Sequence, residues 1–258
     1  MASTNVSVLG IHAIRKAARK AGFDILRNQD GAVFGESSHG PEKCLVWGST
    51  DVGFLAGLTM ANVVHALEAD YGTAIPPISL LGSPLPLAGG FLAADIPALE
   101  TLLKRAWLLS QTLPNALVGR FEQAVIAISA TERESTVRQR VGQSLFREGL
   151  MALWGSRCAI TGLDMPELLR ASHAKPWANS NDVERLDVYN GLLLAAHWDA
   201  AFDVGLVTVS PSGTVMASPA LSESARSLMM ISKNMQIKLQ PQHGPYLTWH
   251  RERVFQAT

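Results

Sequence analysis

The chain has 258 residues, of which 47% are hydrophobic and 17% are charged, and its 22 Lys+Arg residues balance its 22 Asp+Glu residues. This composition can bury a large core, which excludes a disordered chain, and the length suits one large domain or two smaller ones. The zero net charge excludes a strongly basic nucleic-acid-binding module, so any positive surface for DNA must be local.

The sequence also indicates the cellular compartment of the protein. No window approaches the roughly 18 consecutive apolar residues that a membrane span requires. The basic cluster near the N-terminus follows a short apolar stretch, which is the reverse of the order in a secretory signal. The two cysteines, Cys44 and Cys158, are too few for a disulfide framework or a four-cysteine zinc site. We therefore expect a cytoplasmic protein without a membrane partner and without structural zinc.

The first quarter of the chain is typical of an α+β domain. Residues 10–22 place apolar side chains on one face and basic ones on the other, and they end at a glycine, which predicts an amphipathic helix. A second, largely buried helix is expected at residues 54–69. Three short strands separated by turn sequences are expected between these helices, at residues 24–27, 32–35 and 44–47.

Residues 73–94 are rich in glycine, proline and leucine, which indicates an ordered apolar loop that either covers the core or lines a pocket. Two further helices are expected, at residues 97–110 and 116–129. We place the domain boundary near residue 130, because Thr131 and Glu134 form a capping-box pattern that opens a helix reaching about residue 154. Residues 1–130 then form an N-terminal α+β domain, and residues 131–258 form a second domain.

Three arginines of this last helix, Arg133, Arg140 and Arg147, recur every seven residues and therefore share its outer face. Such a row could contact the phosphates of DNA. A solvated surface is the alternative interpretation, because Glu134 and Glu148 lie among the arginines.

The segment from residue 157 to residue 205 carries the candidate chemistry. We expect a short strand at residues 157–162, an apolar strand at residues 192–194 and a helix from residue 197 to 203. The pattern is a strand, a long polar loop, a second strand and a helix. His173 ends the strand that precedes the loop, Asn190 lies where the loop closes, and His197 begins the helix.

The sequences SHAKPW, NGLLL and HWDAAFDVG occur here in that order. They resemble the HNH endonuclease family, and in particular one bacterial, restriction-type subfamily with the pattern SHxKPW, NGLLL and HxDxxFDxG. The flanking sequences RVGQSLFREGLMALWGSRCAITG and PYLTWHRERVF are similar to that subfamily too. The resemblance implies an HNH (ββα-metal) nuclease domain over residues 131–258, with its core at residues 157–205, and so an α+β fold for the chain.

By this resemblance, His173 is the general base that activates water, which suits an imidazole at neutral pH. Asn190 ties the loop and holds the base in place. His197 is a metal ligand, and Asp199 or Asp203 completes the coordination of one divalent cation, Mg²⁺ or Mn²⁺. The pair that holds the ion is left open, because Asp199 and Asp203 form an i, i+4 pair whereas His197 shares a helix face with neither.

The sequence departs from the family pattern at two places. Many relatives have an Asp or a His as a metal ligand before the base, where this chain has Ser172; a hydroxyl is a weaker ligand, so water would complete the coordination. Many relatives also brace the hairpin with a four-cysteine zinc site, whereas only Cys158 lies nearby here and is expected to be a buried small hydrophobe. Lys175, two residues after the base, either contacts a phosphate or is solvated.

After the candidate site we expect a β-hairpin, a short helix, a strand and a closing helix. His250, Arg251 and Arg253 in the closing helix could reach DNA, although a solvated helix face is the simpler interpretation. The hairpin comprises residues 206–210 and 214–217, and the later elements are residues 221–230, 236–240 and 246–255.

The resemblance implies an endonuclease that hydrolyses DNA phosphodiester bonds with a divalent ion, in bacterial restriction or defence, with a recognition domain at residues 1–130. The DNA is expected to be double-stranded; since one hairpin site cuts one strand, a homodimer would account for cutting both. Two alternatives stay open. One is a non-catalytic DNA-binding protein that retains the ββα fold, which Ser172 favours, and the other is a toxin-type nuclease.

Overall fold

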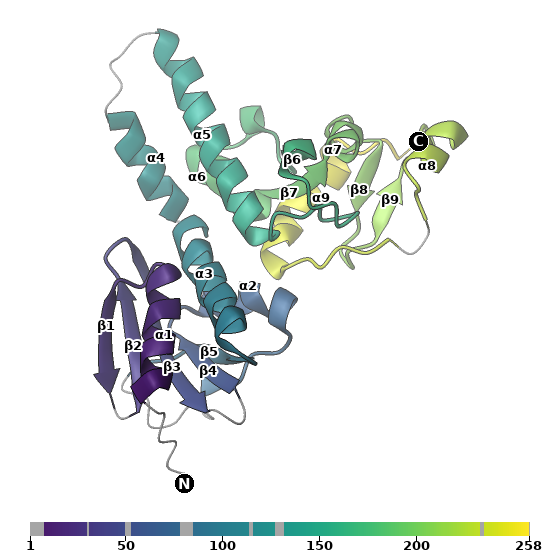
Figure 1. Cartoon of the computed structure of the whole chain (residues 1–258). Helices are drawn as coiled ribbons and strands as arrows, with labels where there is room; N and C mark the ends of the chain where they lie inside the picture. Colours follow the sequence, from purple (N-terminus) through teal and green to yellow (C-terminus); the bar gives the residue numbers. More distant parts are fainter. Residues whose placement is uncertain are drawn as a thin grey trace. The chain divides into compact units, whose positions relative to one another are not determined.

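The computed structural model divides the chain into two compact units, Met1–Gln111 and Thr112–Thr258 (Figure 1). It describes residues 8–29, 31–49, 53–77, 85–113, 116–126, 132–232 and 235–257. Both units mix helices and strands, which confirms the predicted α+β class. The first unit ends at Gln111, whereas the sequence analysis places the domain boundary near residue 130; Thr131 of the predicted capping box lies outside the described residues.

The N-terminal unit is built on an antiparallel sheet in which the strands are neighbours in chain order, from β1 to β5. The α2 helix connects the last two strands. The strands are β1 (Ile25–Gln29), β2 (Ala32–Ser37), β3 (Gly40–Ser49), β4 (Gly53–Leu58) and β5 (Gly89–Ala93), and the helices are α1 (Val8–Lys20), α2 (Ala61–Tyr71) and α3 (Ile96–Thr112).

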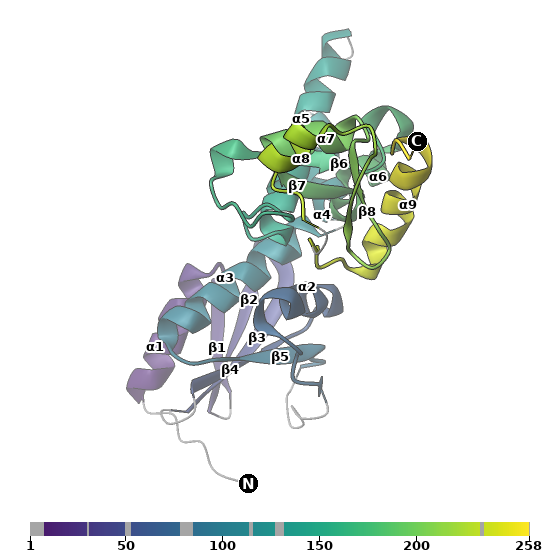
Figure 2. The same ribbon diagram turned by 90° about the vertical axis from the view of Figure 1, so that its right-hand side faces the viewer.

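The two faces of this sheet are covered differently. On one face α1 packs against β1, β2 and β3, with the buried Ile14 close to Gly48, and α3 runs alongside α1 (Figures 1 and 2). On the other face a hydrophobic cluster of Phe34, Leu45 and Leu87 is closed by the segment that leads into β5. The predicted apolar loop therefore packs onto the sheet where it is described, and its residues 78–84 lie outside the described part of the chain.

The prediction of one helix over residues 54–69 is wrong. Gly53–Leu58 is strand β4, which pairs with β3 and β5, and the helix α2 begins only at Ala61. A short apolar run between turn residues suits a buried strand as well as a buried helix, and the neighbouring strands decide between them. The amphipathic helix at the N-terminus and the three strands that follow it are confirmed.

The C-terminal unit contains a β-hairpin followed directly by a helix. Strand β6 (Leu169–His173) pairs antiparallel with β7 (Gly191–Ala195), and α7 (Ala196–Asp203) follows β7 without a loop (Figure 2). The other elements are α4 (Ala116–Ile126), α5 (Glu132–Leu153), α6 (Asp182–Leu186), β8 (Val207–Val209), β9 (Val215–Ala217), α8 (Glu223–Leu228) and α9 (Gly244–Arg253), with short 3-10 helices at Pro166–Leu168, Trp177–Asn179, Val188–Asn190 and Pro241–His243.

Two predicted strands of this unit are wrong. Residues 157–162 form a turn in which the Gly162 amide donates to the Cys158 carbonyl, and the predicted strand at residues 236–240 is reduced to one bridge between Thr214 and Gln236. The hairpin of β8 and β9, the short helix α8 and the closing helix α9 are confirmed. Cys158 is buried, as predicted, and its Sγ also accepts hydrogen bonds from the amides of Thr161 and Ala195. Within the described residues, no helix combines the length and the apolar character needed to cross a membrane.

A buried carboxyl group connects β3 to the start of α2. Glu42 is fully buried, and its Oε1 accepts hydrogen bonds from the Thr59 amide (2.8 Å), the Thr59 hydroxyl (2.8 Å) and the Met60 amide (3.1 Å). Met60 is the N-cap residue of α2 and provides no side-chain cap; Glu42, from a neighbouring strand, instead caps the backbone amides of Thr59 and Met60, where the helix begins. Burial raises the pKa of Glu42.

Replacement of Glu42 by Ala should lower the local free energy of unfolding by about 1–3 kcal/mol, because buried amides lose their acceptor. Hydrogen exchange of peptides that cover residues 54–71 measures this loss. Glu42→Gln is the matched control: it keeps an oxygen acceptor and removes a charge that burial disfavours, so protection at pH 7 should equal or exceed that of the wild type. Equal losses in both variants would contradict the capping role.

Candidate active site

The β6–β7 hairpin places the predicted site residues in register. Ser172 lies opposite Leu192, and His173 lies opposite Gly191. A Cβ atom at Gly191 would lie 2.5 Å from Phe146 Cζ and 2.7 Å from the Ser172 carbonyl oxygen, so a side chain does not fit there. The Asn-Gly pair that the sequence shows is thus required by close packing between the strand and α5.

The imidazole of His173 is held in one orientation and one tautomer. It stacks on Phe146, with ring centroids 3.7 Å apart and an angle of 13° between the planes. Its Nε2 lies 2.9 Å from the carbonyl oxygen of Arg185, which can only accept, so Nε2 carries the proton. Burial lowers the pKa of His173, so the ring is neutral at neutral pH. Its Nδ1 then bears a lone pair and has no partner among the described residues.

Asn190 is fully buried and closes the loop between the two strands. Its Oδ1 accepts from the Lys175 amide (2.8 Å), and its Nδ2 donates to the carbonyls of Lys175 (3.1 Å) and Glu184 (2.9 Å). One side chain therefore connects both ends of the loop. These contacts connect the start of the loop and the α6 segment to the start of β7.

The loop itself is ordered by a short helix, α6. Asn181 caps it through a reciprocal capping box with Glu184. Lys175 Nζ lies 2.6 Å from Glu184 Oε1, so the predicted phosphate ligand is paired in this structure. The Arg185 guanidinium lies over the Trp177 ring at 5.0 Å and donates to the Trp177 carbonyl. These contacts fix the backbone of Arg185, whose carbonyl orients His173.

Two carboxylates and one hydroxyl lie near His173. Ser172, which is buried, donates from Oγ to Asp203 Oδ1 at 3.3 Å, and its hydroxyl is near enough to Asp199 to lower the pKa of that carboxyl group. Partial burial raises the pKa of both aspartates, and the negative charge of Asp199 raises that of Asp203 further. Residues four apart on a helix are about 40° apart around its axis, so Asp199 and Asp203 face Ser172 together.

His197 does not join this group. Residues two apart on a helix are about 200° apart around its axis, so His197 lies on the side of α7 away from Asp199. It is exposed and has no hydrogen-bond partner among the described residues; its ring lies 6.2 Å from that of Trp198. The structure thus brings Ser172, Asp199 and Asp203 together and leaves His197 apart.

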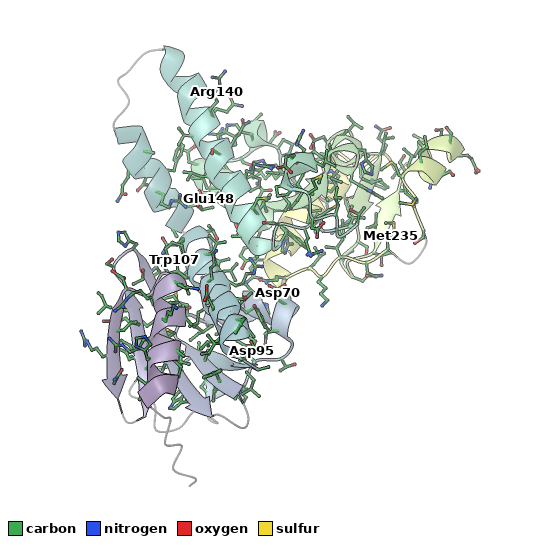
Figure 3. All side chains as sticks on the ribbon, in the orientation of Figure 1. Asp70, Asp95, Trp107, Arg140, Glu148 and Met235 are labelled. Carbon is green, nitrogen blue, oxygen red and sulfur yellow. The ribbon has the colours of Figure 1, made fainter. Side chains whose placement is uncertain are left out.

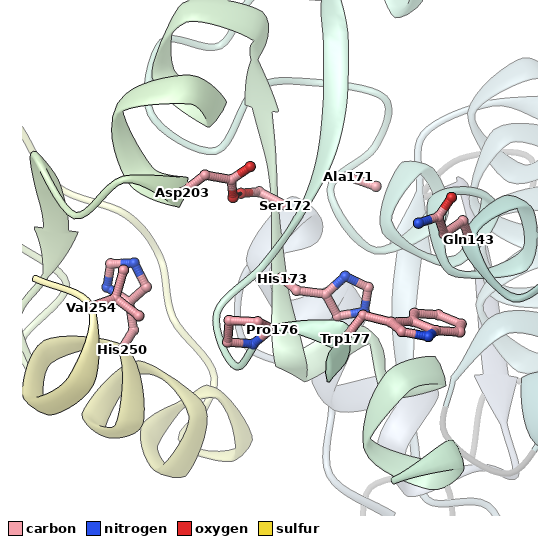
Figure 4. A pocket seen from close by; sticks show the side chains of 9 residues that line it. All are labelled: Gln143, Ala171, Ser172, His173, Pro176, Trp177, Asp203, His250 and Val254. Carbon is pink, nitrogen blue, oxygen red and sulfur yellow. Dashed lines mark hydrogen bonds between the residues drawn. The ribbon is translucent and has the colours of Figure 1, made fainter. Parts of the chain in front are cut away.

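His173 and Asp203 line one cavity of about 400 Å³ (Figure 4). The close-up shows Ser172 and Asp203 on one side of this cavity, His173 and Pro176 in its middle, and Trp177 and Gln143 on the other side. The lining residues are Gln143, Ala171, Ser172, His173, Pro176, Trp177, Asp203, His250 and Val254.

The arginines of the predicted row differ in their contacts. Arg147 donates to the carbonyls of Leu169 and Pro166, both at 2.7 Å, and so braces the start of β6. Arg140 is exposed on α5, where Figure 3 labels it, and has no ion-pair or hydrogen-bond partner in the part of the chain that the structure describes. The side chain of Arg133 lies outside the described residues.

The sequence analysis misjudged or missed several residues of the site. His250 is buried rather than solvated, and Arg251 donates to the Val209 carbonyl, so neither lies on a free helix face. Phe146, Gln143 and the Arg185 carbonyl were not singled out. Phe146 and Gln143 lie in the flanking sequence that resembles the subfamily, but that resemblance assigned no role to either, and a backbone carbonyl leaves no sequence signal.

The donor set is compatible with a small hard cation. Among the described residues, no group of three or more His, Cys, Asp and Glu side chains could hold a metal ion. Mg²⁺ needs no such cage, because it binds through one or two carboxylates and keeps several waters. The two aspartates with the Ser172 hydroxyl offer oxygen donors of this kind, and an ion would relieve the repulsion between the carboxylates.

Residues 158–210 match the family model described as HNH endonuclease. The C-terminal unit contains an HNH domain. The match covers β6, β7 and α7 together with the β8 strand, and it supports the HNH family and a nuclease. No curated protein matches the chain.

Replacement of Asn190 by Ala should release the loop, because three backbone groups lose a buried partner. We expect local unfolding of residues 175–186 to become easier by about 1–3 kcal/mol, measured by hydrogen exchange of that segment. Asn179→Ala, an exposed asparagine of the same loop, is the control and should leave exchange unchanged. If both variants exchange like the wild type, Asn190 does not hold the loop.

Proposed function

We propose that the protein is a metal-dependent HNH endonuclease that hydrolyses phosphodiester bonds of DNA. The observation that supports this most directly is His173: a neutral imidazole with a fixed tautomer, whose free Nδ1 shares a cavity with Asp203. This arrangement serves proton abstraction, since a general base needs a lone pair in reach of a water molecule. The HNH domain supplies the reaction class, and DNA is the substrate that such a domain implies.

In this reaction, Nδ1 of His173 takes a proton from water as the water oxygen forms a bond to phosphorus. The bond between phosphorus and the 3′ oxygen breaks, and the departing oxygen takes a proton from solvent water, which leaves 5′-phosphate and 3′-hydroxyl ends, as the family resemblance implies. The proton on His173 then returns to solvent. The Arg185 carbonyl, which accepts from Nε2, favours the charged imidazolium that results. Phe146 keeps the ring in this plane, so little reorganisation is needed.

Asp199 and Asp203 are the residues we propose as ligands of a divalent cation, Mg²⁺ or Mn²⁺, with the Ser172 hydroxyl beside them. When bound, such an ion stabilises the negative charge that develops on the phosphate and leaving oxygen. This proposal moves the predicted ligand role from His197 to the aspartate pair, because only the aspartates face Ser172.

Arg140 and Lys175 are proposed contacts to the DNA backbone. Arg140 is exposed and available, whereas Lys175 would have to exchange its Glu184 partner for a phosphate. Arg147 is committed to backbone carbonyls, so we propose for it a bracing role in place of the phosphate contact.

We further propose a role in bacterial restriction or defence, in which the N-terminal unit recognises a DNA sequence or modification. The support is its arrangement as a compact unit with its own sheet and core ahead of the nuclease unit, together with the restriction-type sequence resemblance. A homodimer would place two such sites on double-stranded DNA. The cleavage assay below, run on unmodified and naturally modified DNA, tests the recognition role through a preference for one of them.

A non-catalytic DNA-binding protein is the second candidate. It is favoured by Ser172, a neutral residue where many family members have a metal ligand, and by the absence of a three-ligand cluster among the described residues. The two candidates differ in one respect, since a binder retains DNA without cutting it.

His173→Ala should abolish plasmid cleavage, because removal of a general base costs about 100- to 10,000-fold in rate. Cleavage is measured with Mg²⁺, with Mn²⁺ and with EDTA, and EDTA should stop the wild type. His65→Ala, an exposed histidine of the N-terminal unit, is the control and should cut normally. Binding of DNA by the wild type without cutting under any of these conditions would favour the non-catalytic binder.

Substitution of each candidate ligand distinguishes the two assignments of the metal site, the aspartate pair and His197. Asp199→Asn and Asp203→Asn should each weaken Mn²⁺ binding, measured by electron paramagnetic resonance, and reduce cleavage. His197→Ala should leave both unchanged, because its side chain lies away from the carboxylates. The opposite pattern, with loss only in His197→Ala, would return the ligand role to the histidine.

A further inference from the structure

A second buried histidine lies across the cavity from the proposed base. His250 belongs to α9, which lies outside the matched residues 158–210, and it lines the same cavity as His173 and Asp203 (Figure 4). Only 1% of its surface is exposed. The sequence-based interpretation of a solvated residue is therefore replaced by a position in the wall of the site.

The contacts of His250 resemble those of His173 except at one atom. Its ring stacks on Phe202, with centroids 3.8 Å apart and an angle of 8°, and its Nε2 donates to the Phe202 carbonyl at 3.0 Å. Unlike His173, its Nδ1 is occupied, since it lies 2.9 Å from the Thr208 hydroxyl. Because both ring nitrogens are engaged, His250 has no lone pair to offer a water and cannot act as a base without breaking these bonds.

The partner of His250 is the last turn of the helix that carries the aspartates. The final carbonyls of a helix lack intrahelical partners and need others. The Phe202 carbonyl, one residue before Asp203, accepts the backbone amides of Val204 and Gly205 and, in addition, the His250 bond, which connects this turn to α9. Gln256 donates its side-chain amide to the Val204 carbonyl and its backbone amide to the Gly205 carbonyl.

Close packing adds to this connection. A Cβ atom at Gly205 would lie 2.0 Å from the Val254 carbonyl oxygen, and Gly205 has φ 74°, so only glycine fits where the chain leaves α7. The end of α7 and the end of α9 are thus joined by hydrogen bonds, ring stacking and tight backbone contact.

We propose that His250 is a positioning residue for the metal site: it holds the last turn of α7 so that the Asp203 carboxylate faces Ser172 and the cavity. This inference rests on the proposed function and extends it, because it makes the closing helix α9 a working part of the nuclease site beyond the matched segment. His250 stabilises the ligand arrangement and takes no part in the proton transfer.

The test compares two substitutions at this position in the full chain. His250→Phe keeps the stacking on Phe202 but cannot donate to its carbonyl, and should weaken Mn²⁺ binding about 10- to 100-fold, the range found when residues that orient metal ligands are changed. His250→Gln can still donate to the carbonyl and accept from Thr208, and should bind Mn²⁺ much more tightly than His250→Phe. Both are measured by electron paramagnetic resonance titration, with plasmid cleavage as the second measurement.

The control is His243→Phe. His243 is equally buried in the same unit, but it contacts Trp154 and Tyr189 and hydrogen-bonds the Gln240 backbone, away from α7. It should lower the melting temperature while Mn²⁺ affinity stays that of the wild type. If His250→Phe and His243→Phe lower stability alike and neither alters Mn²⁺ affinity, the positioning role is overturned. A wild type that neither binds Mn²⁺ nor cuts DNA would overturn the proposed function itself, and this inference with it.

Discussion

The site depends on the buried amide of Asn190. Its Nδ2 donates to the Glu184 carbonyl, and the next carbonyl along the chain, that of Arg185, accepts from His173. The hydrogen bonds of the Asn190 side chain thus fix the loop, the loop fixes the Arg185 carbonyl, and this carbonyl fixes the tautomer of His173. A buried polar network of this kind is stable only when every member is satisfied, and for Asn190 both the oxygen and the amide nitrogen have partners.

His173 and His250 have almost the same surroundings but differ in the hydrogen bonding of one ring nitrogen, Nδ1. His173 and His250 each stack on a phenylalanine, each donate Nε2–H to a backbone carbonyl, and each have a pKa lowered by burial, to about 4 for His250. The difference is the Thr208 hydroxyl at His250 Nδ1, for which His173 has no counterpart among the described residues. A single hydroxyl therefore distinguishes a ring nitrogen that is hydrogen-bonded from one whose lone pair is free.

The aspartate pair shows how helix geometry selects among candidate ligands. The family resemblance made His197, Asp199 and Asp203 all candidate ligands, and their spacing within two turns of one helix left open which pair holds the ion. The structure turns the two aspartates toward Ser172 and leaves His197 exposed, since the spacing of two residues places it on another face. The carboxylates lie close enough for Asp199 to raise the pKa of Asp203, a repulsion that a divalent cation would remove.

The sequence by itself determined the α+β class and the apolar strand and helix that follow Asn190, because local patterns encode these features. The hairpin came from the family resemblance, and its first strand is Leu169–His173 and not residues 157–162. The sequence did not determine that Gly53–Leu58 is a strand, since a short apolar run takes its structure from the strands beside it. Nor could it show that Phe146 and the Arg185 carbonyl hold the base, that His250 is buried, or that Arg147 braces β6. These are contacts between residues far apart in the chain, and only the tertiary packing brings such residues together.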